Sequence, residues 1–344
     1  MFTQYITLLL LMSVVSGGSF LAPQNNAEVS GVAARNLSLV DYQAKLFDGL
    51  KNILRAISGD EKKVNLLFAG DIQLSRAIGK RMENENDYLW PFRLIASTTR
   101  EADIMFGNLE GPISDKGSDL GGLYSFRADP RSAAGLEYAG FDIVSVANNH
   151  IGDWGREALA DTLSTLEKYG IKYVGGGRNK EEAHTVKIIE SHGMKFGFLA
   201  YNLIESKHAI ARSDSAGITE SELDTMMVDI SKAKEVSDMV VASFHFGGEY
   251  QDLPNREQRK WAESAIEAGA SIVVGHHSHV VQPVELYQSG YIAYSLGNFI
   301  FDQNFSDKTM RGMMLSVTVK NGKIIAVESI ETKISDAYQV YTAN

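Results

Sequence analysis

Side chains that bind metals or transfer protons stand directly after five short apolar segments of the sequence. Five of the eight histidines fall in these motifs, and only His184, His192 and His208 lie elsewhere. One such coincidence would mean little, but five of them predict a single polar site. The motifs are Gly70-Asp71, Asn108-Leu109-Glu110, Asn148-Asn149-His150, His245-Phe246-Gly247 and Gly275-His276-His277-Ser278-His279.

The acidic and amide residues of the first three motifs suit particular roles. Asp71 is a candidate metal ligand, although a single aspartate after a strand is often a helix cap. Glu110 is flanked by glycines that allow close backbone approach, so it can bridge two cations or simply face water. Asn149 offers a neutral oxygen, and His150 can donate a proton to a leaving group. Asp153 either orients that imidazole or caps the following helix.

The histidines of the last two motifs leave two arrangements open. On an extended chain alternate residues share a face, so His277 and His279 converge and His276 points away. If the chain coils early, His276 and His279 pair instead. His245 is a further candidate ligand, the alternative being a structural histidine. Imidazole and carboxylate groups without thiolate suit manganese, iron or zinc better than copper(I).

Composition removes several classes of function. The 344 residues include no cysteine, which excludes disulfides, thiolate zinc sites and cysteine nucleophiles. The net charge of -10, without a long basic run, argues against a nucleic-acid partner. The sequence also lacks a Gly-x-Ser-x-Gly nucleophile elbow and a Gly-x-x-x-x-Gly-Lys phosphate loop.

The segments before these motifs have the pattern of strands that alternate with helices. Strands are expected at 64–69, 104–106, 143–147, 239–244 and 272–274, with helices such as 156–169 and 256–268. This pattern predicts a sheet covered on both faces, with ligands bound beyond the carboxyl ends of its strands. Further strands are expected at 284–287, 291–295, 313–320 and 323–330, the last two joined by an Asn-Gly turn. Together these elements predict an α/β two-sheet sandwich flanked by helices, as one domain over about residues 60–335.

The amino-terminal region differs from the rest of the chain. An uncharged apolar stretch over 6–21, followed by a polar segment rich in small residues, predicts that residues 1–30 are a signal peptide or membrane anchor. Apolar residues at helical spacing over 36–58 predict a stem helix. The main domain is therefore expected outside the cytoplasm, either anchored to the membrane or secreted.

These motifs, in this order from Asn65 to Asp302, resemble the poly-γ-glutamate capsule synthesis protein CapA family. Further matches are Glu249-Tyr250 and Tyr294-Ser295-Leu296-Gly297-Asn298-Phe299. The family is a branch of the calcineurin-like metallophosphoesterases, so the resemblance implies a four-layer, metallo-dependent phosphatase-like fold. It also implies one or two divalent ions that activate a hydroxide. The implied ligands are Asp71 and His279 at the first ion, bridging Glu110, and Asn149, His245 and His277 at the second, with His150 as general acid.

One departure affects the chemistry that is carried over. The superfamily's first motif is Asp-x-His, but Gln73 stands where the histidine would be. Two functions are therefore expected in competition: a metal-dependent hydrolase of a phosphoester or polymer amide, or a non-catalytic component that grips an anionic polymer. Arg76 and Asn298 are the expected substrate contacts, although Arg76 is also typical of an ordinary surface residue. The resemblance implies a membrane-bound polymer synthase complex as partner.

Overall fold

A computed structural model describes residues 63–343 of the chain. The expected signal or anchor segment at 1–30 and the stem helix at 36–58 lie outside the described residues. Within 63–343 no helix combines the length and apolar character needed to cross a membrane.

The larger sheet has eight strands in the described part, and β1 lies near its centre. β1 pairs in parallel with β2 on one side and antiparallel with β14 on the other, while the short β13 pairs with its carboxyl end. The strand order is β16-β15-β14-β1-β2-β3-β4, with β13 off this path. The bounds are β1 Lys63–Ile72, β2 Ile104–Leu109, β3 Ile143–Ser145, β4 Lys172–Val174, β13 Asn298–Ile300, β14 Arg311–Lys320, β15 Lys323–Ile334 and β16 Val340–Thr342.

The second sheet has six strands among the described residues, in the order β11-β12-β10-β9-β7-β6. Its centre is parallel, because β9 pairs in parallel with both β7 and β10, and antiparallel pairs close both edges. The bounds are β6 Lys187–Ser191, β7 Met194–Asn202, β9 Met239–His245, β10 Ile272–His276, β11 Val284–Tyr287 and β12 Gly290–Ala293. A separate two-stranded pair joins β5 Gly176–Gly177 to β8 Gly217–Ile218.

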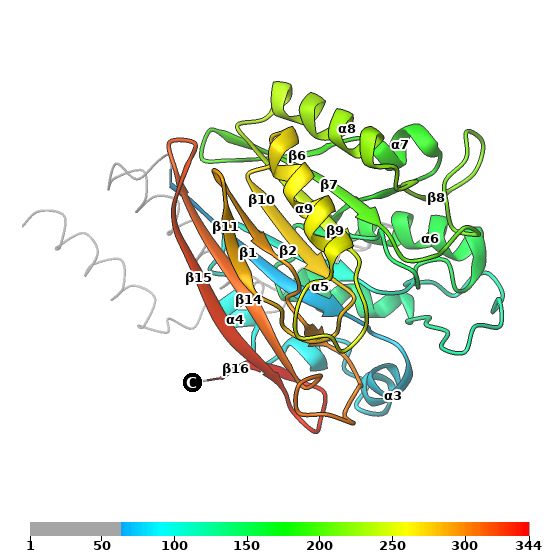
Figure 1. Cartoon of the computed structure of the whole chain (residues 1–344). Coiled ribbons are helices and arrows are strands. Elements are labelled where there is room, and N and C mark those ends of the chain that lie inside the picture. Colours follow the sequence, from blue (N-terminus) through cyan, green and yellow to red (C-terminus); the bar gives the residue numbers. More distant parts are fainter. Residues whose placement is uncertain (1–62, 344) are drawn as a thin grey trace, which may run out of the picture. The chain divides into compact units, whose positions relative to one another are not determined.

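Period-2 alternation along the strands explains why the two sheets stack. Leu66 and Phe68 of β1 lie in the core between the sheets with Phe198 of β7, whereas Leu67 and Ala69 face the opposite way. Both faces of each central strand are therefore buried. Figure 1 shows the resulting layers, with helices outside each sheet.

Helices cover both outer faces of the sandwich. α8 and α9 pack on the outer face of the second sheet through residues such as Ile230 and Trp261 (Figure 1). On the outer face of the larger sheet, Ile78 of α3 and Leu163 of α6 pack into a core with Leu67. The bounds are α3 Arg76–Asn84, α4 Ala96–Thr99, α5 Ala133–Tyr138, α6 Gly155–Lys168, α7 Lys180–His184, α8 Leu223–Val236 and α9 Arg256–Ala268, with short 3-10 turns η1 Trp90–Phe92 and η2 Pro130–Ser132.

The predicted two-sheet sandwich flanked by helices is confirmed, but the assignment of strands to sheets was wrong. The five strands that carry the motifs divide, with β1, β2 and β3 in the larger sheet and β9 and β10 in the second. The strands expected after residue 283 also divide, with β11 and β12 in the second sheet and β14 and β15 in the larger one. β16 extends the larger sheet to Thr342, beyond the expected end at 335. Local patterns specify strands, whereas pairing partners depend on contacts distant in sequence.

Candidate metal centre

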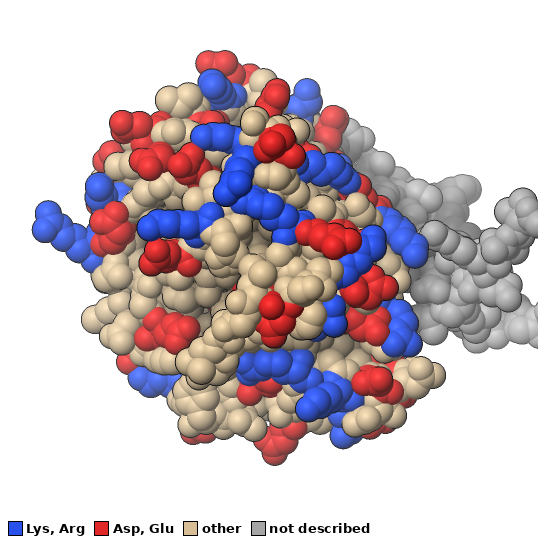
Figure 2. Space-filling view, turned by 90° about the vertical axis from the view of Figure 1, so that its right-hand side faces the viewer, with Lys and Arg blue, Asp and Glu red and all other residues tan. Residues whose placement is uncertain are grey.

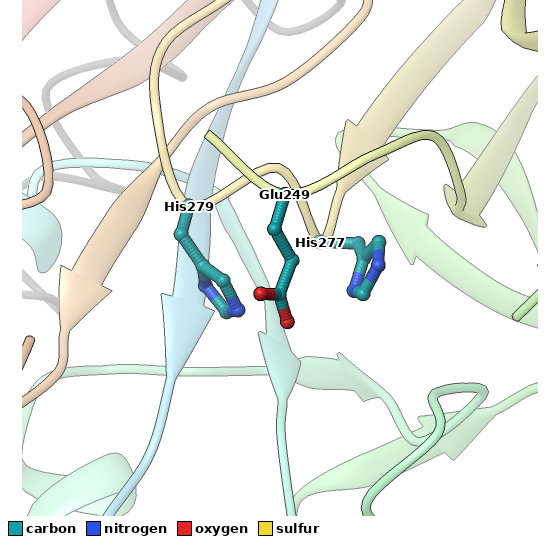
Figure 3. Close-up of side chains that lie close together, drawn as sticks. All are labelled: Glu249, His277 and His279. Atoms are coloured by element: carbon teal, nitrogen blue, oxygen red, sulfur yellow. The ribbon is translucent and has the colours of Figure 1, made fainter. Parts of the chain in front are cut away.

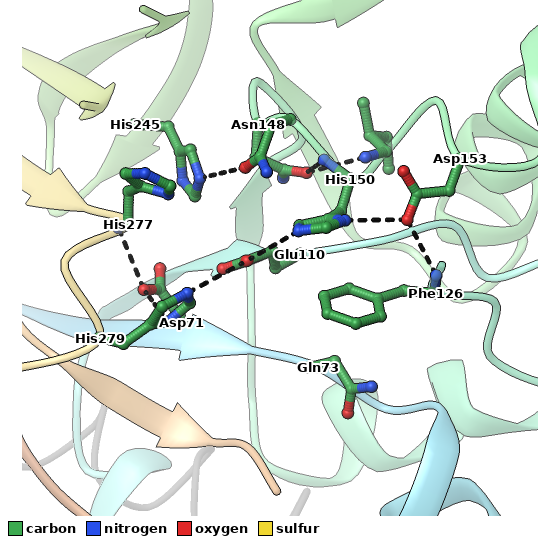
Figure 4. Close-up of polar contacts among 12 residues, drawn as sticks. Asp71, Gln73, Glu110, Phe126, Asn148, His150, Asp153, His245, His277 and His279 are labelled. Atoms are coloured by element: carbon green, nitrogen blue, oxygen red, sulfur yellow. Dashed lines mark hydrogen bonds and ion pairs between the residues drawn. The ribbon is translucent and has the colours of Figure 1, made fainter. Parts of the chain in front are cut away.

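The predicted site residues come together where the carboxyl ends of strands from both sheets meet (Figure 4). The larger sheet contributes Asp71 from β1, Glu110 just after β2, and His150 from the turn after β3. The second sheet contributes the histidines at and after the ends of β9 and β10, including His245 and His277. The motifs therefore converge as the sequence predicts, although two sheets rather than one supply them.

Glycine before two of these motifs allows the backbones to approach closely. A Cβ atom at Gly70 would lie 1.9 Å from the carbonyl oxygen of Gly297, and one at Gly275 would lie 2.0 Å from that of Tyr294. No other residue fits at either position without moving the neighbouring strand. The close approach at Gly70 brings Asn298 opposite Asp71 in the parallel pair of β13 and β1.

Asp71 is fully buried and its carboxylate is well supplied with donors. Asn108 donates from Nδ2 to Oδ1 over 2.8 Å, and the backbone N–H of His277 donates to Oδ2 over 3.1 Å. Imidazole Nδ1 atoms of His276 and His279 lie 3.3 and 3.4 Å from the two carboxylate oxygens. Burial opposes ionisation, yet contacts with His276 and then His279 hold the pKa of Asp71 well below its usual value. Asp71 is therefore an anion in this site.

Glu110 has the opposite environment. Its side chain is buried, and neither carboxylate oxygen has a hydrogen-bond partner among the described residues. The nearest imidazole nitrogens are Nε2 of His279 at 3.8 Å and Nε2 of His150 at 4.0 Å. Burial raises the pKa of Glu110 to about 7, with the charge of His279 opposing the rise. A buried carboxylate without donors is costly unless a cation binds it, so the donor set fits a metal ion.

His150 is held from two sides. Its Nδ1 lies 2.9 Å from Oδ2 of Asp153, and the same oxygen accepts the backbone N–H of Phe126 over 2.8 Å. The ring of Phe126 stacks on the imidazole with centroids 4.1 Å apart. Asp153 does not cap α6, whose N-cap residue is Trp154 and has no side-chain cap bond. This leaves Nε2 of His150 directed at Glu110, as Figure 4 shows.

His245 and His277 lie side by side across the site. Their ring centroids are 4.7 Å apart, and Nε2 of His245 lies 2.7 Å from Oδ1 of Asn149. Burial, reinforced by the nearby imidazole of His277, holds the pKa of His245 well below its usual value. Burial likewise lowers the pKa of His277 to about 3. Both rings are therefore neutral near pH 7, the state in which imidazole binds a metal.

Backbone conformation decides how the last three histidines face. His276 ends β10, is fully buried and contacts Asp71, so the expectation that it points away from the site is wrong. His277 and His279 then adopt positive φ values of 89° and 56°, which turn both imidazoles into the site. His279 Nδ1 lies 2.9 Å from Oδ1 of Asn298, which leaves Nε2 facing Glu110.

Two groups of ligand-capable atoms lie next to each other. Atoms of Asp71, Glu110 and His245 lie within 4.8 Å of one another, and so do atoms of Glu249, His277 and His279. The first group matches three expected ligands. The second includes a carboxylate that the sequence did not predict as a ligand. The division of ligands between two ions that the family resemblance implies stays a prediction.

Gln73, which stands where the superfamily has a histidine ligand, is directed away from the site. Its Nε2 donates to Oγ of Ser75 over 2.7 Å, and Figure 4 shows the side chain turned away from Asp71. Gln73 is buried, and its Oε1 has no partner among the described residues. Gln73 therefore adds no ligand to the cluster.

The two expected substrate contacts lie at different depths. Arg76 is one-third exposed and forms an ion pair with the carboxylate of Asp302, while its guanidinium lies 4.9 Å from the ring centre of Phe126. Asn298 is fully buried, and its Nδ2 donates to Gln303 and to the backbone of Thr309. Arg76 is thus at the mouth of the site, whereas Asn298 orients His279 from behind. Contact of either residue with substrate stays a prediction.

Sequence reasoning missed two residues of the site. Phe126 lies on a loop without an apolar pattern, and only the fold brings its ring against His150. Glu249 stands four residues after His245, and its place beside His277 and His279 was not predicted. The signals in the sequence were its place after Gly247 and Gly248 in a motif that ends a strand, and the match of Glu249-Tyr250 to the family.

Comparison with known proteins shows the family of the chain. Residues 65–303 match the family described as bacterial capsule synthesis protein PGA_cap. The chain belongs to this family. It is 31% identical over 265 residues to a PGA biosynthesis protein CapA from Bacillus subtilis, with 74% of this chain and 68% of that protein covered. It is 30% identical over 261 residues to a capsule biosynthesis protein CapA from Bacillus anthracis, with 72% of this chain covered.

The PGA_cap chain spans 62% of the length of the Bacillus anthracis relative. Among solved structures, a Haemophilus influenzae NAD nucleotidase overlaps with a TM-score of 0.47 and 12% identity, covering 82% of this chain and 60% of that one. The fold assignment therefore rests on the sheet order and layers described above. Family membership, as expected from the motifs, is confirmed by the match over 65–303.

Proposed function

We propose that this chain is a metal-dependent hydrolase of capsule or exopolymer synthesis that cleaves a phosphoester or the amide of an anionic polymer of the poly-γ-glutamate type. The observation that carries the proposal is the carboxylate of Glu110, which is buried beside several imidazoles without one hydrogen-bond donor among the described residues. Such a group suits a cation and has no evident structural purpose without one.

The side chains around Glu110 provide the rest of the chemistry. Asp71, His245 and His277, with Glu110, would hold one or two divalent ions, of which manganese, iron or zinc fit oxygen and nitrogen ligands. A bound ion supplies a hydroxide nucleophile and polarises the bond that is attacked. His150, whose Nδ1 is held by Asp153, would deliver a proton from Nε2 to the leaving group.

The location and partners of the chain belong to the same proposal. The apolar segment within residues 1–30 favours an extracytoplasmic domain that is either anchored or secreted. The names of the relatives, a capsule and a PGA biosynthesis protein, favour a place in the synthesis of such a polymer. We propose a membrane-bound polymer synthase complex as partner from the resemblance of the motifs to this family. Arg76, one-third exposed at the mouth of the site, would meet the anionic substrate.

A second candidate function is polymer binding without catalysis. It is favoured by the side chain of Gln73, which is directed at Ser75 and away from the metal-binding cluster. A site with one ligand fewer can bind a metal and still fail to activate water. In that case the metal and Arg76 would grip the polymer.

Metal content and turnover together test the proposal. The purified full-length chain and a His277→Ala, His279→Ala double variant are analysed for bound metal and assayed on a generic phosphodiester and on poly-γ-glutamate. We expect about one to two equivalents of metal in the wild type, lost in the double variant together with hydrolysis. Metal without hydrolysis of either substrate would favour the binding function. A folded wild type that takes up neither manganese nor zinc would refute the metal site.

A further inference from the structure

Glu249 lies on the loop between β9 and α9, at the edge of the site. Its carboxylate extends between the imidazoles of His277 and His279, as Figure 3 shows. One ligand-capable atom from each of the three residues lies within 4.8 Å of the other two. Glu249 is exposed and the two histidines are buried, so the carboxylate approaches the cluster from the solvent side.

Backbone contacts hold this loop against the histidine segment. The N–H of Tyr250 donates to the carbonyl oxygen of Ser278 over 2.8 Å, which fixes the residue after Glu249 beside the one between the two histidines. Tyr250 has a positive φ of 60°, and its hydroxyl accepts from Nε2 of Gln303 over 3.1 Å. The position of Glu249 is therefore set by the fold.

Unpartnered buried atoms beside Glu249 indicate what the three residues would bind. His277 is only 6% exposed, and its Nδ1 has no hydrogen-bond partner in residues 63–343. Glu110, whose two oxygens also lack partners there, has one carboxylate oxygen 3.8 Å from Nε2 of His279. Buried ligand atoms without hydrogen-bond partners, next to a carboxylate on the solvent side, suit a bound cation.

The same loop offers a reason why Gln73 is tolerated. The first strand motif lacks its histidine, and the side chain of Gln73 is directed at Ser75. A carboxylate from the opposite side of the cluster can supply the missing donor, because manganese, iron and zinc all accept carboxylate oxygen in place of imidazole nitrogen.

We propose that Glu249 is a metal ligand which, with His277 and His279, binds one divalent cation and replaces the donor that Gln73 does not provide. This inference rests on the metal site of the proposed function and adds one ligand to it. An open position at the ion would remain for water or substrate, since three protein ligands leave a tetrahedral site incomplete.

The test compares Glu249→Gln with Asp252→Asn in the full-length chain. Asp252 is a carboxylate on the same loop, but it pairs with Lys308 over 2.6 Å and belongs to neither ligand group. The two substitutions therefore remove the same charge from the same loop. Binding of manganese and of zinc is measured by calorimetric titration and by elemental analysis after dialysis, with circular dichroism to check that each variant is folded.

We expect Glu249→Gln to lower the affinity for one equivalent of metal about 10- to 100-fold, or to lose that equivalent on dialysis, while Asp252→Asn binds as the wild type does. Equal metal affinity and stoichiometry in wild type and Glu249→Gln would overturn the inference and leave the proposed function standing. Equal losses in both variants would also overturn it, since they would point to the net charge of the loop. A wild type that binds no metal would refute the proposed function itself.

Discussion

At the level of single residues, the site combines satisfied and unsatisfied carboxylates. Asp71 receives two hydrogen bonds and two imidazole contacts, whereas Glu110 receives no hydrogen bond from the described residues. This difference distinguishes a carboxylate that protein groups already hydrogen-bond from one that has no partner unless a cation binds it. The imidazole of His150 is partly satisfied, since Asp153 holds its Nδ1 and leaves its Nε2 directed into the site.

Asp153→Asn tests the orientation of His150. In wild type one carboxylate oxygen of Asp153 contacts both the imidazole of His150 and the N–H of Phe126. The neutral amide of asparagine accepts these hydrogen bonds more weakly, so the orientation of the ring is held less firmly. We expect hydrolysis to fall about 10- to 100-fold with metal content unchanged. Turnover of a generic phosphodiester and elemental analysis are the measurements.

Asp161→Asn is the matched control for this variant. Asp161 lies on α6 and bonds to Ser114 and Lys116, away from the site. Its loss should leave turnover unchanged. Normal turnover in Asp153→Asn, or an equal decrease in both variants, would show that Asp153 does not position His150.

At the level of elements, glycines at strand ends decide how closely the strands meet. Gly70 of β1 lets the segment that leads into β13 approach closely, because a Cβ there would lie 1.9 Å from the carbonyl oxygen of Gly297. α9 is positioned more conventionally, by a capping box in which Asn255 and Gln258 bond each other's backbone N–H. The end of β1 thus depends on a glycine that leaves room for neighbouring backbone, whereas the start of α9 depends on the side chains of Asn255 and Gln258.

Gly70→Ala tests the close approach at the end of β1. The new Cβ would lie 1.9 Å from a backbone oxygen that cannot rotate away, so we expect a loss of about 3 kcal/mol or more in the free energy of unfolding. Urea denaturation measures it. Gly248→Ala is the control, because its Cβ would meet only Gln251 at 3.4 Å. Equal urea midpoints for the two variants would mean that the backbone at Gly70 can move apart without loss of folding free energy.

At the level of the whole molecule, the site joins the two sheets. Asp71, Glu110 and His150 come from the larger sheet, and His245 and His277 from the second. A ligand bound between them would therefore stabilise the sandwich as a whole. The face shown in Figure 2 has basic and acidic side chains interspersed, so this face offers no broad cationic surface.

Metal removal tests this link between site and fold. An ion that binds only the folded chain adds about 2.7 kcal/mol to its stability at a hundredfold excess over Kd. We expect EDTA to lower the melting temperature of the wild type by several degrees and added manganese or zinc to restore it. The His277→Ala, His279→Ala variant should respond little. A wild type that melts at the same temperature with EDTA and with metal would contradict the expected link.

Sequence by itself determined the motifs and the elements that carry them. Apolar runs that end in polar residues marked the strands of the site, and α9 was predicted with the observed bounds of Arg256–Ala268. Such features are local, because burial period, capping residues and glycines act over a few positions. The convergence of the motifs was also predicted, because ligands bind beyond the carboxyl ends of strands, although the expected single sheet proved to be two.

Tertiary structure alone decided the arrangement within the site. Which sheet each strand joins, and the stacking of Phe126 on His150, depend on contacts between distant segments. The direction in which the imidazoles of His277 and His279 point depends on positive φ values that period-2 alternation does not describe. The approach of Glu249 likewise depends on a backbone bond between two loops. Long-range packing selects among local conformations of similar free energy, so these features cannot be predicted from any one segment of the sequence.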